Sequence, residues 1–234
     1  MHLRLKCEVL FGVYTYLSEP FVWSISTSGG IVAETFDIKF KIIFARESSI
    51  AKSVALSLIK TKPITVWEIM IPVIFILNFV KIKQSREVFI QNHLFTKELA
   101  LRAAFDMVKK AQSKKTAMTK IKSKTKEILS SVTSGIYSDD IRSEQIKEID
   151  LLIDHYSKLF KVEGEDYFSL IIGAYQTRED YAAFLKHLQS AENKVIVAAQ
   201  RTLGAQADMK AASQLEMLTE RVRVAELEKI FKID

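Results

Sequence analysis

The sequence is poor in residues that interrupt helices. It has three prolines and seven glycines in 234 residues, and no proline follows Pro72. Proline breaks a helix interior and glycine weakens it, so the 162 residues after Pro72 favour long helices. The single cysteine, Cys7, excludes an internal disulfide, and we interpret it as a small buried apolar side chain rather than a reactive thiol.

The sequence also lacks the short motifs of common enzymes. It has no glycine-rich phosphate loop, no C-x-x-C, no H-E-x-x-H and no E-x-x-H. We therefore predict no catalytic residues, no metal ligands and no cofactor, and favour a non-enzymatic role. One alternative stays open, a helical-bundle enzyme built around Asp154, His155 and Glu165.

Residues 1–45 are predicted to be strand-prone, because they are rich in β-branched and aromatic side chains. In "FDIKFKIIF" (36–44) apolar and polar residues alternate, which is typical of a half-buried strand. The pattern then changes to a helical one, and 46–62 are predicted to form an amphipathic helix that ends at Pro63.

Residues 63–82 form the longest apolar segment, "PITVWEIMIPVIFILNFVKI", in which Glu68 is the one charged residue before Lys81. The seventeen residues between Pro63 and Lys81 span about 26 Å as a helix, close to the hydrocarbon thickness of about 30 Å. We therefore predict a transmembrane helix, whose notable residues are Trp67, Glu68, Pro72 and Asn78. The alternative is a buried helix of a water-soluble core.

Charge is concentrated after this segment. The chain carries a net charge of +6, but residues 81–130 alone hold 13 basic and 4 acidic residues, which is +9. Residues 83–130 are predicted to be a basic helical stretch. Its densest part, 109–126, has eight lysines and no acid, with a thin apolar stripe at helical spacing. Such a helix suits anionic headgroups at a membrane surface. The predicted headgroup ligands are Lys109, Lys110, Lys114, Lys115, Lys120, Lys122, Lys124 and Lys126.

Two other interpretations of the lysine-rich stretch stay open. Lysines also neutralise nucleic-acid phosphates, although this stretch has no arginine and no aromatic residue to recognise bases. A plain solvated helix face is the third interpretation.

Residues 138–234 are predicted to be a helical bundle. Ser138 can begin one helix and Thr177 another, since both residue types favour the N-cap position. Gly135 and Gly164 mark turns. In the last helix, Leu215, Leu218, Val222 and Ala225 are spaced like a heptad seam, which indicates packing on a neighbouring helix, a protein partner or self-association.

The stretches "LIKTKPITVWEIMIPVIFILNFVKIKQSREVFIQNHLFTKELAL" (58–101) and "EQIKEIDLLIDHYSKLFKVEGEDYFSLIIGAYQTREDYAAFL" (144–185) resemble an uncharacterised bacterial family. Its members carry one hydrophobic segment followed by a helical region. The resemblance covers residues 50–234 and implies membrane association with no assigned activity.

Together these features predict a mostly α protein with a small strand-prone N-terminal region, one transmembrane helix and a helical bundle. The expected function is that of a membrane-associated adaptor or scaffold, whose C-terminal domain is cytoplasmic. The alternatives are a soluble helical nucleic-acid-binding protein that uses residues 109–126, and the helical-bundle enzyme.

Overall fold

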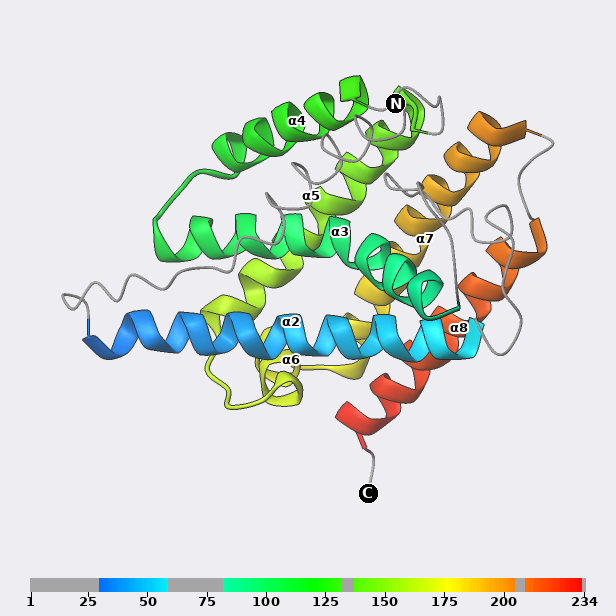
Figure 1. The fold of residues 1–234 in the computed structure, drawn as a ribbon. Helices are drawn as coiled ribbons and strands as arrows, with labels where there is room; N and C mark the ends of the chain where they lie inside the picture. Colours follow the sequence, from blue (N-terminus) through cyan, green and yellow to red (C-terminus); the bar gives the residue numbers. More distant parts are fainter. Residues whose placement is uncertain (1–29, 59–81, 132–136, 205–208, 233–234) are drawn as a thin grey trace. The chain divides into compact units, whose positions relative to one another are not determined.

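The computed structural model describes residues 30–58, 82–131, 137–204 and 209–232. Within these ranges the chain is all helical and contains no strand (Figure 1). The chain divides into two units, Met1–Ala33 and Glu34–Asp234, and the side-chain contacts given below lie within the second. The helices are α2 (Gly30–Leu58), α3 (Ile82–Lys109), α4 (Lys114–Ser131), α5 (Asp139–Lys161), α6 (Tyr167–Tyr175), α7 (Arg178–Leu203) and α8 (Met209–Ile230).

The strand predicted over residues 36–44 is wrong, because this sequence lies inside α2. The alternating pattern also contains a helical one. Phe36, Phe40 and Phe44 are four residues apart, and the buried Lys39, Ile43 and Glu47 form a neighbouring row with the same spacing. The helix predicted over 46–62 is the second half of α2 as far as Leu58. Strands predicted within residues 1–29 lie outside the described residues.

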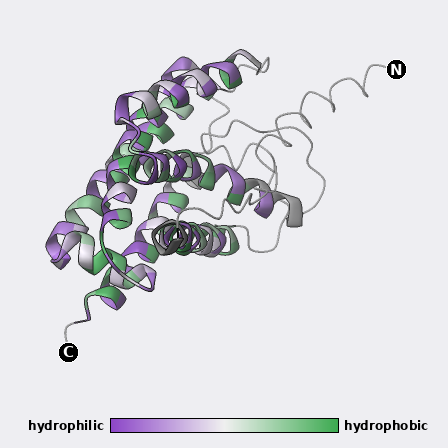
Figure 2. Cartoon of the chain, turned by 90° about the vertical axis from the view of Figure 1, so that its left-hand side faces the viewer, coloured by the Kyte–Doolittle hydropathy of each residue, from purple (hydrophilic) through white to green (hydrophobic). Residues whose placement is uncertain are grey.

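One hydrophobic core connects all seven described helices. It is built on α5, which packs along both α3 and α7. The apolar residues of α5 recur at intervals of three and four, and Ile149, Leu152, Ile153 and Tyr156 are fully buried. Helix α4 folds back over α3, and α8 packs on α7 (Figure 1). Figure 2 shows hydrophilic and hydrophobic residues on different sides of the helices, as expected when one face of each helix enters a core.

Helix α2 joins this core through long side chains. The Phe40 ring meets the Phe105 ring of α3 edge-on, with 5.5 Å between centroids. Lys39 Nζ donates hydrogen bonds to the carbonyl oxygens of Phe160 and Val162, at 3.3 and 2.7 Å. These carbonyls belong to the end of α5, where a helix has unpaired acceptors and a partial negative charge.

The turns of the C-terminal region form as the sequence indicates. Ser138 Oγ accepts a hydrogen bond from the Ile141 N–H and caps α5. Thr177 does the same for α7 through the Asp180 N–H, at 3.1 Å. Between these helices, Gly164 lies in the turn that precedes the short helix α6. This hairpin lets α7 return along α5.

A second, smaller apolar cluster joins the end of α2, the start of α3 and α8. Val54, Ala55 and Phe89 are buried in it together with Leu215. Leu218 and Val222 of the predicted heptad seam pack on the same cluster, whereas Ala225 is exposed. Most of the seam is therefore occupied within the unit.

The predicted transmembrane helix over 63–82 begins in a part of the chain, 59–81, that lies outside the described residues, and so do Trp67, Glu68, Pro72 and Asn78. Among the helices that the structure describes, none combines the length and the apolar character needed to cross a membrane.

Candidate functional site

The lysine-rich stretch 109–126 is divided between two helices. Helix α3 ends at Lys109, α4 begins at Lys114, and Ala111 between them has a left-handed backbone with φ of 50°. Ser113 Oγ accepts a hydrogen bond from the Thr116 N–H at 3.1 Å and so caps α4. The break contains neither glycine nor proline, and Ser113 is the one sequence signal that marks it.

The apolar stripe of α4 packs on the bundle. Ala117, Ile121 and Ile128 are buried in the main core, with Met118 packed against them. Helices α3 and α5 cover this stripe within the folded unit. Any contact that α4 makes with a partner uses its opposite, polar side.

Five of the eight predicted ligands interact with the bundle itself. Lys109 pairs with Asp37 at 2.8 Å and Lys110 with Asp106 at 2.7 Å. Lys114 lies between Asp150 and Asp154, at 2.9 and 2.8 Å. Lys120 reaches Gln112 at 3.4 Å, and Lys124 is half-buried. Burial lowers the pKa of the Lys124 ammonium.

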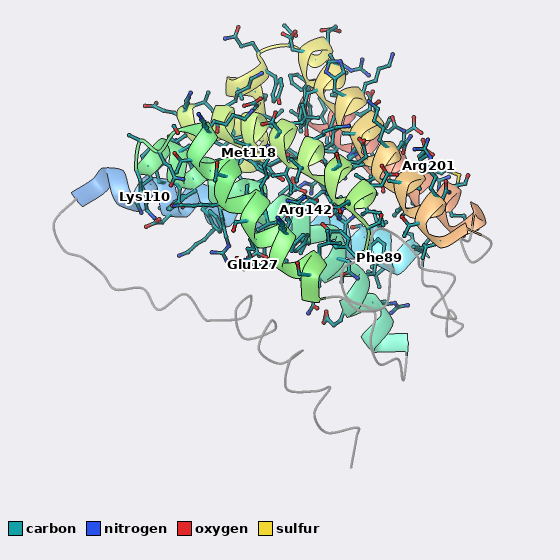
Figure 3. The ribbon with its side chains drawn as sticks, turned by 90° about the horizontal axis from the view of Figure 1, so that it is seen from above. Phe89, Lys110, Met118, Glu127, Arg142 and Arg201 are labelled. Atoms are coloured by element: carbon teal, nitrogen blue, oxygen red, sulfur yellow. The ribbon has the colours of Figure 1, made fainter. Side chains whose placement is uncertain are left out.

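The other three, Lys115, Lys122 and Lys126, are exposed and pair with no carboxylate among the described residues. Their spacing of seven and four residues places them on one side of α4, opposite the buried stripe. We call these three residues the α4 lysine face. Figure 3 views α4 from above, with Met118 and Glu127 along it and Arg142 of α5 beside it. Arg142 donates to Thr125 Oγ1 and to the Lys122 carbonyl, which fixes α4 on α5.

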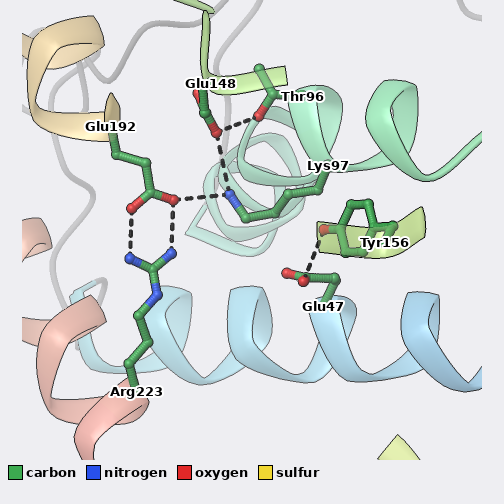
Figure 4. A network of polar contacts seen from close by, with 7 residues as sticks. All are labelled: Glu47, Thr96, Lys97, Glu148, Tyr156, Glu192 and Arg223. Carbon is green, nitrogen blue, oxygen red and sulfur yellow. Dashed lines mark hydrogen bonds and ion pairs between the residues drawn. The ribbon is translucent and has the colours of Figure 1, made fainter. Parts of the chain in front are cut away.

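A buried polar network joins α3, α5, α7 and α8 (Figure 4). Glu192 accepts two hydrogen bonds from the Arg223 guanidinium, at 2.7 and 2.8 Å, and one from Lys97 at 3.2 Å. Lys97 also lies 3.6 Å from Glu148, which accepts a hydrogen bond from Thr96 at 2.8 Å. Two cations and two carboxylates thus neutralise one another where four helices meet.

Glu47 of α2 is a third carboxylate near this network. It is buried and accepts a hydrogen bond from the Tyr156 hydroxyl at 2.9 Å. Burial raises the pKa of Glu47, and also that of Glu148, even though Lys97 acts in the opposite sense. Burial also acts to raise the pKa of Glu192, but the positive charges of Arg223 and Lys97 outweigh burial, so the Glu192 pKa is lowered. The two cations therefore hold the Glu192 carboxylate in its ionised form.

The network borders a small cavity of about 70 Å³, enough for a few water molecules. Its walls include His93, whose Nε2 is buried without a hydrogen-bond partner among the described residues, and the amides of Asn92, Gln145 and Gln189. Sequence reasoning missed this site because its members come from separate helices, and Thr96 and Arg223, for example, lie 127 positions apart along the chain. One signal was available: Gln145 and Glu148 occupy positions of the α5 stripe that otherwise holds core residues.

The residues of the suggested enzyme site are not brought together. His155 is buried, stacked on Phe184 with 4.2 Å between ring centroids, and its Nδ1 lies 2.7 Å from the Tyr175 hydroxyl. Burial lowers the pKa of His155 to about 3, so the ring is neutral. Asp154 is exposed and pairs with Lys114, and Glu165 is exposed before α6.

Within the described ranges, His, Cys, Asp and Glu side chains form no group of three or more that could hold a metal ion. Comparisons of the chain with protein-family models, with curated proteins and with solved structures find no match.

Proposed function

We propose that this chain is a membrane-associated, non-catalytic helical scaffold that is anchored by its apolar segment 63–82. The proposal rests on the apolar sequence of this segment, and the packing of the two helices that flank it restricts the topology. Lys109 of α3 pairs with Asp37 of α2, and Phe105 packs on Phe40. Nearer the segment, Val54 and Phe89 share the second apolar cluster.

This packing restricts how the segment meets a bilayer. A straight helix of seventeen residues would deliver its far end to the opposite membrane surface, about 26 Å away. Helices α2 and α3 would then lie on opposite sides and could not form one core. In place of a single crossing, we propose that the segment enters and leaves the bilayer on the same side. The whole unit 34–234 then lies on that side, which we propose is the cytoplasmic one.

Two measurements on the full chain test this proposal. The first is an alkaline carbonate wash of membranes from cells that express it. We expect the protein to stay with the membrane, because apolar insertion does not depend on ionic contacts. Release into the wash would contradict insertion.

The second measurement tests the single-sided topology with cysteine labelling. In a Cys7→Ser background, Ser49→Cys on α2 and Ser213→Cys on α8 each introduce one exposed thiol. We expect a membrane-impermeant maleimide to label both in inside-out vesicles, and neither in intact cells before permeabilisation. If only one of the two positions is labelled in inside-out vesicles, the segment crosses the bilayer once and the proposed topology is wrong.

A further inference from the structure

The outward side of α4 has a charge that the folded unit does not use. Lys115, Lys122 and Lys126 are exposed, and the side chains between them are hydroxyls, Thr119 and Ser123. At 1.5 Å per residue the three lysines lie about 10 and 6 Å apart along the helix axis. The face is polar throughout, because the apolar residues of α4 are buried in the core.

The position of Lys115 opposes helix stability. It lies in the first turn of α4, where the helix dipole is positive and a cation is unfavourable. Its neighbour Lys114 is compensated by Asp150 and Asp154, whereas Lys115 has no such partner among the described residues. Local folding therefore gives no reason for a lysine at this position, but an anionic partner outside the chain does.

We propose that the α4 lysine face docks on anionic lipid headgroups and holds α4 against the surface of the membrane. The inference rests on the membrane association proposed above, since a tethered unit meets headgroups at high local concentration. Three separate point charges without arginine, aromatic or apolar side chains match a fluid anionic surface, which needs neither base stacking nor bidentate geometry. Each lysine near such a surface contributes about 1 kcal/mol, so three together favour docking on the order of a hundredfold.

The test places a reporter on this face of the full chain. In a Cys7→Ser background, Thr119→Cys carries a fluorophore, and the protein is reconstituted into phosphatidylcholine bilayers with or without phosphatidylglycerol. We expect a water-soluble quencher to reach the fluorophore less in the anionic bilayers. Because the contact is ionic, high salt should remove this protection.

The variant Lys115→Gln/Lys122→Gln/Lys126→Gln should lose the protection entirely. A matched control, Lys161→Gln/Lys186→Gln/Lys194→Gln, removes the same charge from exposed positions on α5 and α7 and should keep it. The first variant should unfold at the same temperature as the wild type or a higher one, so misfolding does not explain the loss. Equal protection in both variants, or none in the wild type, overturns the inference.

The same vesicles separate this inference from the proposed anchor. If carbonate releases the protein from both kinds of vesicle but salt-sensitive protection persists on the anionic ones, the anchor is wrong and the docking face stands. If carbonate releases no protein and the protection never depends on lipid charge, the anchor stands and the docking face is wrong. Loss of duplex DNA binding by the face variant without any change on vesicles would assign the three lysines to nucleic acid and overturn the lipid assignment.

Discussion

At the scale of single residues, the break between α3 and α4 depends on an unfavourable backbone. Ala111 has a positive φ of 50°, a conformation that glycine adopts without the steric cost borne by other residues. Its methyl group is exposed, so removing it sacrifices no core contact.

We therefore expect Ala111→Gly to raise the free energy of unfolding by about 0.5–1 kcal/mol, as measured by urea denaturation. Ala212 on α8 is helical, and Ala212→Gly is the control that should lower stability by a similar amount. Destabilisation by Ala111→Gly would show that the left-handed residue is not strained.

At the scale of helices, Lys39 connects α2 to the end of α5. Its ammonium donates to two carbonyls that α5 leaves unpaired. Lys39→Met keeps most of the aliphatic stem but removes these bonds, and should lower the free energy of unfolding by about 1–2 kcal/mol. Lys52→Met, at an exposed position of the same helix, should change it by less than about 0.5 kcal/mol. Equal effects would mean that the contact contributes no stability.

The buried network makes a second prediction about helices, this time for α7 and α8. Removing one partner of a buried ion pair leaves the other charge uncompensated, so Glu192→Met and Arg223→Met should each cost about 3 kcal/mol. The loss of stability in the double variant should be smaller than the sum of the two single losses by at least about 1 kcal/mol, because neither partner of this pair is left as an uncompensated charge. Thermal or urea unfolding of all four proteins gives this coupling. Simple additivity would show that the two residues do not stabilise each other.

The same scale shows what the sequence could predict and why. The stripe of α5 and the caps Ser138 and Thr177 depend on residues within a few positions of each other, and local patterns determine them. The sequence of residues 36–44 fits both the period of a strand and that of a helix. The helix is favoured by packing of Phe40 on Phe105 and of Phe36 on Phe160, and both partners are distant in sequence. The sequence shows that residues 109–126 are rich in lysine. Which of these lysines form ion pairs depends on carboxylates that are distant in sequence, Asp37, Asp150 and Asp154.

At the scale of the whole molecule, buried histidines link stability to pH. Burial lowers the folded-state pKa of His155 to about 3, and lowers that of His93 as well, whereas an unfolded histidine titrates near 6.5. Between these values the unfolded chain binds more protons, so the free energy of unfolding should fall as the pH drops from about 6.5 toward 3. The buried Glu47 and Glu148 have raised pKa values, so the folded chain binds more protons at these two groups. Their contribution makes the free energy of unfolding fall as the pH rises above about 4.5.

A comparison of variants isolates the histidine contribution from these opposing carboxylates. His155→Phe keeps a ring stacked on Phe184 and removes the titrating group, although it also loses the hydrogen bond to Tyr175. We expect its stability to decline less steeply between pH 6.5 and 4.5 than that of the wild type, by up to about 1.4 kcal/mol per pH unit. His187 is exposed on α7, and His187→Phe should leave the wild-type slope unchanged. Parallel curves for His155→Phe and the wild type, measured by urea denaturation at each pH, would mean that His155 is protonated in the folded core. Its stacking among Phe184, Tyr175 and Tyr181 would then have to tolerate a charge that no described carboxylate contacts.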